Sequence, residues 1–194
     1  MRAGNNGISA KTVENIQFGA GTIHKGLKNE GGTWNFEASC VGATKGGSSL
    51  KIVPEFYTVS PDGSSVAVKD FKRKIGETAT MDVNLLELNA DMLKASVIGE
   101  DGESDVTGYN LIKSKDAIEE GDYWENIAFV GETLDNKNII VILPNALCTS
   151  SLSIEGKNNE EAVGKFTFEC HGDANDSLTT LPYKIYYPAN AEAE

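Results

Sequence analysis

The residues able to do chemistry are few and widely spaced. The chain has two histidines, His24 and His171, and each lies in or at the end of a predicted strand. His171 follows Cys170, but neighbours on a strand point to opposite faces, so this pair lacks the spacing of metal ligands. The glycine-rich stretch at 19–26 has His24 where a dinucleotide loop needs its third glycine, and the stretch at 42–49 lacks the GK[ST] ending of a phosphate loop.

No other motif supplies a catalytic centre. The sequence contains no GxSxG, HExxH or EF-hand pattern. Carboxylates are plentiful, but acid–base catalysis needs a defined pocket and shifted pKa values, which a sequence does not reveal. Cys40, Cys148 and Cys170 have no CxxC spacing, and we interpret them as small buried residues in a reducing compartment. We therefore expect no enzymatic activity, no cofactor and no metal.

The charge balance argues against a protein that grips nucleic acid. The chain of 194 residues has 17 basic and 29 acidic side chains, a net charge of −12, whereas DNA-binding proteins present cations to phosphates. One basic cluster, KDFKRK at 69–74, lies among turn-forming residues. It is either a solvated loop or an ion-pairing surface for an acidic partner.

Length and composition predict a single domain over 1–194 with a proper core. The first twenty residues do not resemble a signal peptide, and the longest aliphatic run, at 139–143, is too short to cross a bilayer. We therefore expect the protein to be made in the cytoplasm and to have no membrane partner.

Alternating apolar residues predict a mainly β fold. Period-2 or short apolar runs occur at 16–24, 50–58, 66–71, 79–85, 123–130, 138–143, 152–154, 163–170 and 183–187. Turn-forming residues such as PDG at 61–63 and DNKN at 135–138 separate them. Many short strands joined by such turns favour two packed antiparallel sheets, as a β-sandwich or a flattened barrel.

One helix is predicted, over residues 89–98. From Leu88 the apolar spacing lengthens from two to three or four, with Asn89 or Asp91 as the N-cap and Gly99 as the end. A single helix beside a sandwich closes one end of the core or covers a sheet edge.

Three kinds of segment do not fit a compact sandwich. The connection 28–49 is long and glycine-containing, yet it carries Trp34 and Phe36, so we expect it to pack on something. The stretch 99–108 is acidic and glycine-rich, and we expect it to be mobile. The ends, at about 1–11 and 189–194, are predicted to be flexible arms that order against a neighbour.

The stretch GATKGGSSLKIVPEFYTVSPDGSSVAVKDFKRKIGETATMDVNLLELNADML, at 42–93, resembles the central region of tail tube (major tail) proteins of long-tailed bacteriophages and prophages. A glycine loop precedes KIVPEFYTV, then VKDFKRKIGE follows, and ETATMDVNLLEL leads into the helix. NIIVILPNALCTSSLSIEGKNNEEAVGKFTFECHGD, at 138–173, resembles the closing strands of that family. The resemblance covers about residues 12–187.

This resemblance implies a structural role in a virion. It implies two packed sheets with a flanking helix, and rings of usually six subunits stacked into a hollow tail tube. It also implies assembly in the host cytoplasm around a tape measure protein, contact with other tail proteins, and later passage of DNA through the lumen without sequence specificity. Tube proteins of contractile tails and type VI secretion systems are the nearest alternative. The other alternative is a carbohydrate-binding or adhesin-like module that displays Tyr183, Tyr186 and Tyr187 in a row.

The resemblance also suggests how the charge is used. Six copies of this chain would carry about −72 charges, and a bore sharing that bias would repel phosphate and let DNA slide. We expect part of the acidic excess to face the bore. The alternative is that it is spread over the exterior for solubility.

Candidate inter-subunit residues come from three segments. Trp34 and Phe36 are the expected anchors of the 28–49 loop on a neighbouring ring. In the 60–75 segment, the candidates are Lys69, Lys72, Arg73 and Lys74, facing acidic loops of an adjoining subunit. In the helix, Met92 and Leu93 are expected to abut a neighbour while other residues close the sandwich.

Overall fold

The computed structural model describes residues 7–9, 11–154, 156 and 158–189, so most of the two predicted terminal arms lies outside the described residues. The fold is mainly β, as predicted, with one large antiparallel sheet, two small hairpins and short helices. In the large sheet the strand order is β1-β8-β9-β10-β5-β4, and β11 also pairs with β9. The bounds are β1 (Gln17–His24), β4 (Ser49–Thr58), β5 (Lys72–Leu85), β8 (Trp124–Thr133), β9 (Asn138–Cys148), β10 (Gly164–Cys170) and β11 (Lys184–Tyr186).

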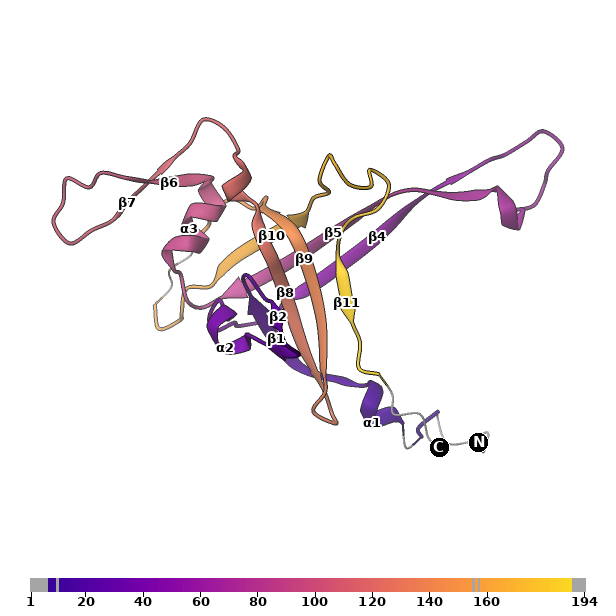
Figure 1. Cartoon of the computed structure of the whole chain (residues 1–194), viewed down its shortest axis with the longest axis horizontal. Coiled ribbons are helices and arrows are strands. Elements are labelled where there is room, and N and C mark those ends of the chain that lie inside the picture. Colours follow the sequence, from indigo (N-terminus) through magenta and orange to yellow (C-terminus); the bar gives the residue numbers. More distant parts are fainter. Residues whose placement is uncertain (1–6, 10, 155, 157, 190–194) are drawn as a thin grey trace.

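Strand β9 joins the two halves of the sheet. Along one side it pairs with β8, from the Trp124–Ala146 pair to the Glu132–Asn138 pair. Its other side is divided, because β10 pairs with residues 146–148 and β11 with residues 140–142. The β10-β5-β4 half crosses the β1-β8-β9 half (Figure 1), and the main core lies between them.

The main core is built from the alternating residues that predicted the strands. In β5 the inward residues are Ala79, Met81, Val83 and Leu85, which are all buried. Inward residues of the other strands complete it: Ile23, Trp124, Ile127, Phe129, Leu143, Ala146, Cys148, Phe166, Phe168 and Cys170. Because every second residue of each strand is apolar, the sheet can bury one face over its whole width.

The opposite face of β8 and β9 is also covered. A second cluster contains Leu27, Ala128, Val130, Ile140 and Ile142. The segment after β1 covers it with β2 (Asn29–Glu30), β3 (Thr33–Trp34) and α2 (Phe36–Ser39). The 28–49 connection therefore packs on the sheet of its own chain, where its apolar residues find their partners.

Helix α3 (Ala90–Val97) confirms the predicted helix and its N-cap. The Asn89 side chain accepts a hydrogen bond from the Met92 backbone N–H at 2.9 Å, satisfying one of the unpaired donors at the helix start. The end differs from the prediction: Ile98 adopts the left-handed conformation, with φ 48°, and Gly99 instead begins β6. A β-branched residue is strained there, so tertiary packing overrides the local preference.

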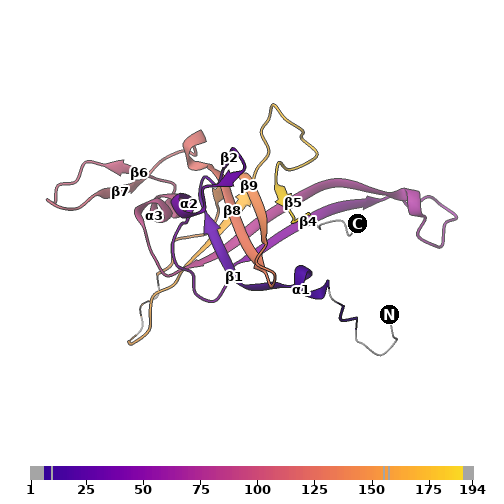
Figure 2. The same cartoon turned by 60° about the horizontal axis from the view of Figure 1, so that its bottom comes forward.

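Two hairpins extend from the body in opposite directions along the longest axis of the molecule (Figures 1 and 2). One is the outer part of β4 and β5 with the connection between them, residues 53–76, here called the β4–β5 arm; it contains η1 (Lys69–Phe71). The other, residues 99–114, is the β6–β7 arm, formed by β6 (Gly99–Gly102) and β7 (Leu111–Ser114).

Several predicted elements need correction. Residues 66–71 form no strand and end in the 3-10 turn η1, because their apolar residues have no sheet to pack on. Residues 152–154 form no strand either. The acidic stretch predicted to be a mobile loop instead starts a paired hairpin, with Glu100 opposite Lys113. The remaining elements are α1 (Thr12–Asn15) and η2 (Glu120–Asp122).

Candidate assembly surface

The β4–β5 arm places large apolar side chains in solvent. Its exposed apolar residues are Val53, Phe56, Tyr57, Val59, Val66, Val68 and Ile75. Single exposed apolar residues are normal on a protein surface, but a projection that carries seven of them suggests a contact surface. The arm has no second layer to cover it, since the core cluster ends near Leu50 and Ile52 on β4 and Ala79 on β5.

Backbone pairing keeps the arm extended far beyond the core. Phe56 is opposite Lys74, Tyr57 is opposite Arg73, and a bulge next to Glu55 leaves Ile75 as the additional residue. The Val59 N–H donates to Phe71 O at 3.0 Å and continues the hairpin past the last paired residues. Paired residues share a face of the ribbon, so each face carries one aromatic ring and at least one cation.

Most cations of the arm have no anionic partner. Lys69, Lys72 and Arg73 form no ion pair within the described part of the chain, although the Lys72 ammonium lies 4.5 Å from the Phe56 ring centroid. Such a cation–π contact favours the charged amine over the ring face. The predicted basic cluster therefore lies on a projecting hairpin, and its three free cations are available to a partner.

The base of the arm is fixed by one carboxylate. Glu77 accepts hydrogen bonds from the Lys74 ammonium at 2.5 Å and from the Leu181 backbone N–H at 2.7 Å. These bonds hold the pKa of Glu77 below its ordinary value of 4.5, the Lys74 contact being the largest cause. Lys74, predicted to meet an adjoining subunit, thus has a partner in its own chain and braces the arm against the 181–183 segment.

The path of the large sheet ends in β1 and β4, whose outer sides lack a neighbouring strand. The end of β1 is an exception, because the Ile23 carbonyl accepts a hydrogen bond from the Val41 N–H and His24 is bridged to Cys40. Elsewhere each of the two strands presents backbone N–H and C=O groups to which another strand can add. In β4 the run is interrupted by Pro54, which has no N–H to donate. A strand added to β4 can therefore form an unbroken ladder only on one side of Pro54.

Trp34 and Phe36 lie on the body, where they anchor the β2–β3–α2 segment to the second cluster. Their rings stack with centroids 6.3 Å apart, and Tyr186 of β11 meets Trp34 edge-on at 5.2 Å. Both are half-buried. These contacts all lie within one chain. That Trp34 and Phe36 also anchor one ring of subunits on the next stays a prediction, and only the exposed parts of their side chains are available for it.

A buried histidine fastens the same segment to β1. The His24 Nδ1 lies 2.9 Å from Ser39 Oγ, and its Nε2 lies 2.8 Å from Thr22 Oγ1. Ser39 donates its hydroxyl proton to Asn35 O, so it accepts from an Nδ1–H, and Nε2 accepts from Thr22. Burial lowers the pKa of His24 from its ordinary 6.5 and favours this neutral ring.

The structure corrects the prediction for Met92. Its side chain is 1% exposed and packs in the main core, because α3 closes that end of the sheet. Leu93, one residue on, is half-buried, and its contact with a neighbour stays a prediction.

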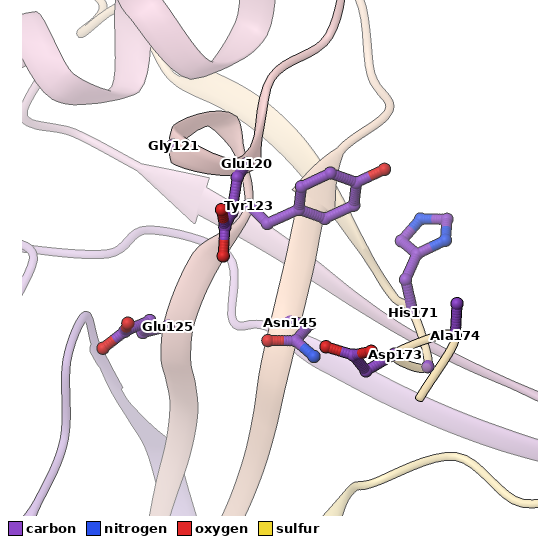
Figure 3. A pocket seen from close by; sticks show the side chains of 9 residues that line it. Glu120, Gly121, Tyr123, Glu125, Asn145, His171, Asp173 and Ala174 are labelled. Carbon is purple, nitrogen blue, oxygen red and sulfur yellow. The ribbon is translucent and has the colours of Figure 1, made fainter. Parts of the chain in front are cut away.

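A hollow with a volume of about 820 Å³ lies beside η2 and the end of β10. Figure 3 shows Tyr123, Asn145 and His171 along it, together with the carboxylates of Glu120, Glu125 and Asp173. The Nε2 atom of His171 is buried there and has no hydrogen-bond partner among the described residues, and its ring meets Tyr123 edge-on at 5.5 Å. Within the described residues no three His, Cys, Asp or Glu side chains are placed to hold a metal ion.

Comparison with known proteins gives a distant structural likeness and no match at the level of sequence families. No protein-family model matches the chain, and neither does any curated protein. Among solved structures, it is similar to a chain described as "Virion of native gene transfer agent (GTA) particle". The two chains share 16% sequence identity with a TM-score of 0.40, and the likeness covers 79% of this chain and 92% of that one.

Other predicted features are separated by the fold. Tyr183 packs toward the main core, whereas Tyr186 and Tyr187 are exposed, so the three do not form a row. Cys148 and Cys170 are buried, as predicted, and burial raises the pKa of the Cys170 thiol to about 11. The prediction is wrong for Cys40, which forms an isolated bridge opposite His24 at the end of β1 and is exposed. Among the described residues, no helix is long and apolar enough to span a membrane.

The β6–β7 arm is a candidate contact surface that was not predicted from the sequence. Val106, Tyr109 and Leu111 are exposed on it. A usable signal was present, since an aromatic and two aliphatic residues in an acidic, glycine-rich stretch do not suit a purely solvated loop.

Proposed function

We propose that this chain is a structural virion protein, a tail tube subunit that assembles into stacked rings, usually of six copies, around a hollow lumen. In this proposal the tube forms on a tape measure protein, joins other tail proteins, and conducts DNA without reading its sequence. The chain has a mechanical and architectural role, and it catalyses no reaction.

The observation that carries this proposal is the β4–β5 arm. Its exposed apolar side chains and free cations lie on a paired hairpin that leaves the body, where they contribute nothing to the core of their own chain. A segment so placed supports contact with another molecule. Two further observations support it. The sequence resembles tail tube proteins over about residues 12–187. The fold is mainly β with a helix closing one end, as that resemblance implies.

Ring formation uses the unpaired sides of β1 and β4. When the β4 side of one copy meets the β1 side of the next, each sheet continues into its neighbour, and the unpaired sides of these two strands are covered. A repeated heterologous contact closes into a ring, and an acidic wall inside that ring lets a polyanion slide.

The test is assembly as a function of protein concentration. Purified protein, alone and with its tape measure partner, is followed by sedimentation velocity and negative-stain microscopy. Annular or cylindrical particles are expected to appear above a threshold concentration. A chain that stays monomeric at every concentration with the tape measure protein present contradicts the proposal.

A second candidate function rests on the hollow beside η2. Tyr123, Asn145 and Asp173 combine an aromatic ring with amide and carboxylate groups, which suits hydrogen bonding to a sugar. This observation favours a carbohydrate-binding module. Saccharide titration followed by NMR shifts at these three residues, in a chain that remains monomeric, would favour it over the tube.

A tube subunit of a contractile injection system has the same architecture and differs in its outer partner. Co-sedimentation of assembled tubes with a sheath protein separates that alternative from a long non-contractile tail.

A further inference from the structure

The two arms differ in charge as well as in direction. The β4–β5 arm, residues 53–76, holds four basic and three acidic side chains, a balance of +1, whereas the β6–β7 arm, residues 99–114, holds four acidic and one basic, a balance of −3. Both arms also carry exposed apolar residues, including Phe56 and Val66 on the first and Val106 and Tyr109 on the second. The two surfaces are therefore complementary in charge and alike in apolar content.

Charged side chains that form no ion pair within their own chain are the ones available to another copy. On the β6–β7 arm, Asp101 pairs with Lys94 at 2.9 Å and Glu100 pairs with Lys113 at 3.5 Å. Glu103 and Asp105 form no ion pair with any described residue. They face solvent in the turn region of the arm, as Lys69 and Arg73 do toward the end of the other arm.

We propose that the β4–β5 arm of one copy docks on the β6–β7 arm of another copy, with Lys69 and Arg73 meeting Glu103 and Asp105. The arms point to opposite ends of the molecule (Figures 1 and 2), so one copy cannot satisfy both within itself. Different surfaces meet in this contact, which therefore repeats head to tail and propagates along an assembly.

This inference rests on the proposed function, because it names the surfaces through which successive copies join. Apolar contacts between Val66 and Tyr109 regions supply affinity, and the ion pairs supply orientation and partner choice. The pairs are exposed, so added salt weakens the contact.

Charge reversal tests the pairing. The variant Lys69→Glu/Arg73→Glu is expected to raise the threshold concentration for assembly by about tenfold at low salt, and so is Glu103→Lys/Asp105→Lys. The combined four-residue variant restores complementarity and is expected to return close to the wild-type threshold. Matched controls reverse the same number of charges on the body, at Lys165 and Lys184 or at Glu132 and Asp176. These side chains are exposed and form no ion pair with the residues that the structure describes.

Cross-linking tests the geometry independently. In a Cys40→Ser background, copies with Val66→Cys are mixed with differently tagged copies with Tyr109→Cys. Head-to-tail docking gives disulfides between the two kinds of copy. Disulfides mainly between two Val66→Cys copies mean a symmetric contact and overturn the proposal.

The remaining outcomes separate the two proposals. The arm pairing is wrong, and the tube role stands, if the wild type forms particles and neither charge-reversed variant changes the threshold concentration for assembly. The same holds if the combined variant has a threshold as high as that of either two-residue variant. If Glu120→Lys/Asp173→Lys blocks assembly and Glu103→Lys/Asp105→Lys does not, the acidic hollow receives the arm, which also overturns this pairing. If the wild type forms no particles, the tube role fails first.

Discussion

Removing two aromatic rings from the β4–β5 arm should impair assembly and leave the subunit folded. Phe56 is 52% exposed and Tyr57 is 58% exposed. Full burial of a large apolar side chain is worth about 1.5–3 kcal/mol, so burying the exposed half of each ring contributes about 1 kcal/mol. Phe56→Ala/Tyr57→Ala should therefore cost about 2 kcal/mol per contact, which raises the threshold concentration about 30-fold.

Threshold concentrations are measured by sedimentation across a dilution series, and the folded state of each variant by urea denaturation. The free energy of unfolding should change by less than about 0.5 kcal/mol per residue, because neither ring touches the core. Leu178→Ala is the control, since Leu178 is 83% exposed and lies outside both arms. A double variant that assembles at the wild-type threshold, or a control that shifts it equally, refutes the role of the arm.

Three further outcomes concern the body. Trp34→Ala should lower the free energy of unfolding, measured in urea, by about 2 kcal/mol, because this half-buried ring packs on the second cluster. An unchanged urea midpoint would mean that the β2–β3–α2 segment is held in place without Trp34. Asn89→Ala should lower the same quantity by about 1 kcal/mol through loss of the α3 cap, and Asn89→Ser should recover most of it. The lowered pKa of His24 means that the unfolded chain takes up its proton first, so His24 contributes stability above pH 6.5 that is lost as the pH falls through its folded pKa. His24→Gln should flatten this part of the stability profile in urea titrations at several pH values, and a profile as steep as that of the wild type would contradict the assignment.

The sequence predicted the elements whose side chains bury themselves. Ala79, Met81, Val83 and Leu85 revealed strand β5 because alternation and burial coincide there. The first residues of β5, starting at Lys72, were missed, since KRKIG shows no such alternation. That part is a strand because β4 pairs with it, and pairing with a distant segment leaves no trace in local periodicity.

The same reasoning explains the uneven result for candidate contacts. Trp34 and Phe36 were recognised as residues that must pack, but a sequence does not say whether the surface they cover belongs to their own chain. Met92 fits both a core position and an interface position by helical spacing, and only the position of α3 over the sheet assigns it to the core. Contact residues in charged loops are easier to predict from the sequence, because side chains such as Lys69 and Arg73 have no role in a core.

The course of β5 also determines how the subunit bears mechanical load. One unbroken strand of 14 residues runs from the β4–β5 arm into the centre of the body, flanked by β4 on one side and β10 on the other. Tension applied along the arm is directed parallel to these strands, so it shears many backbone bonds together instead of peeling them one after another. A filament linked through such arms would stretch little before it broke.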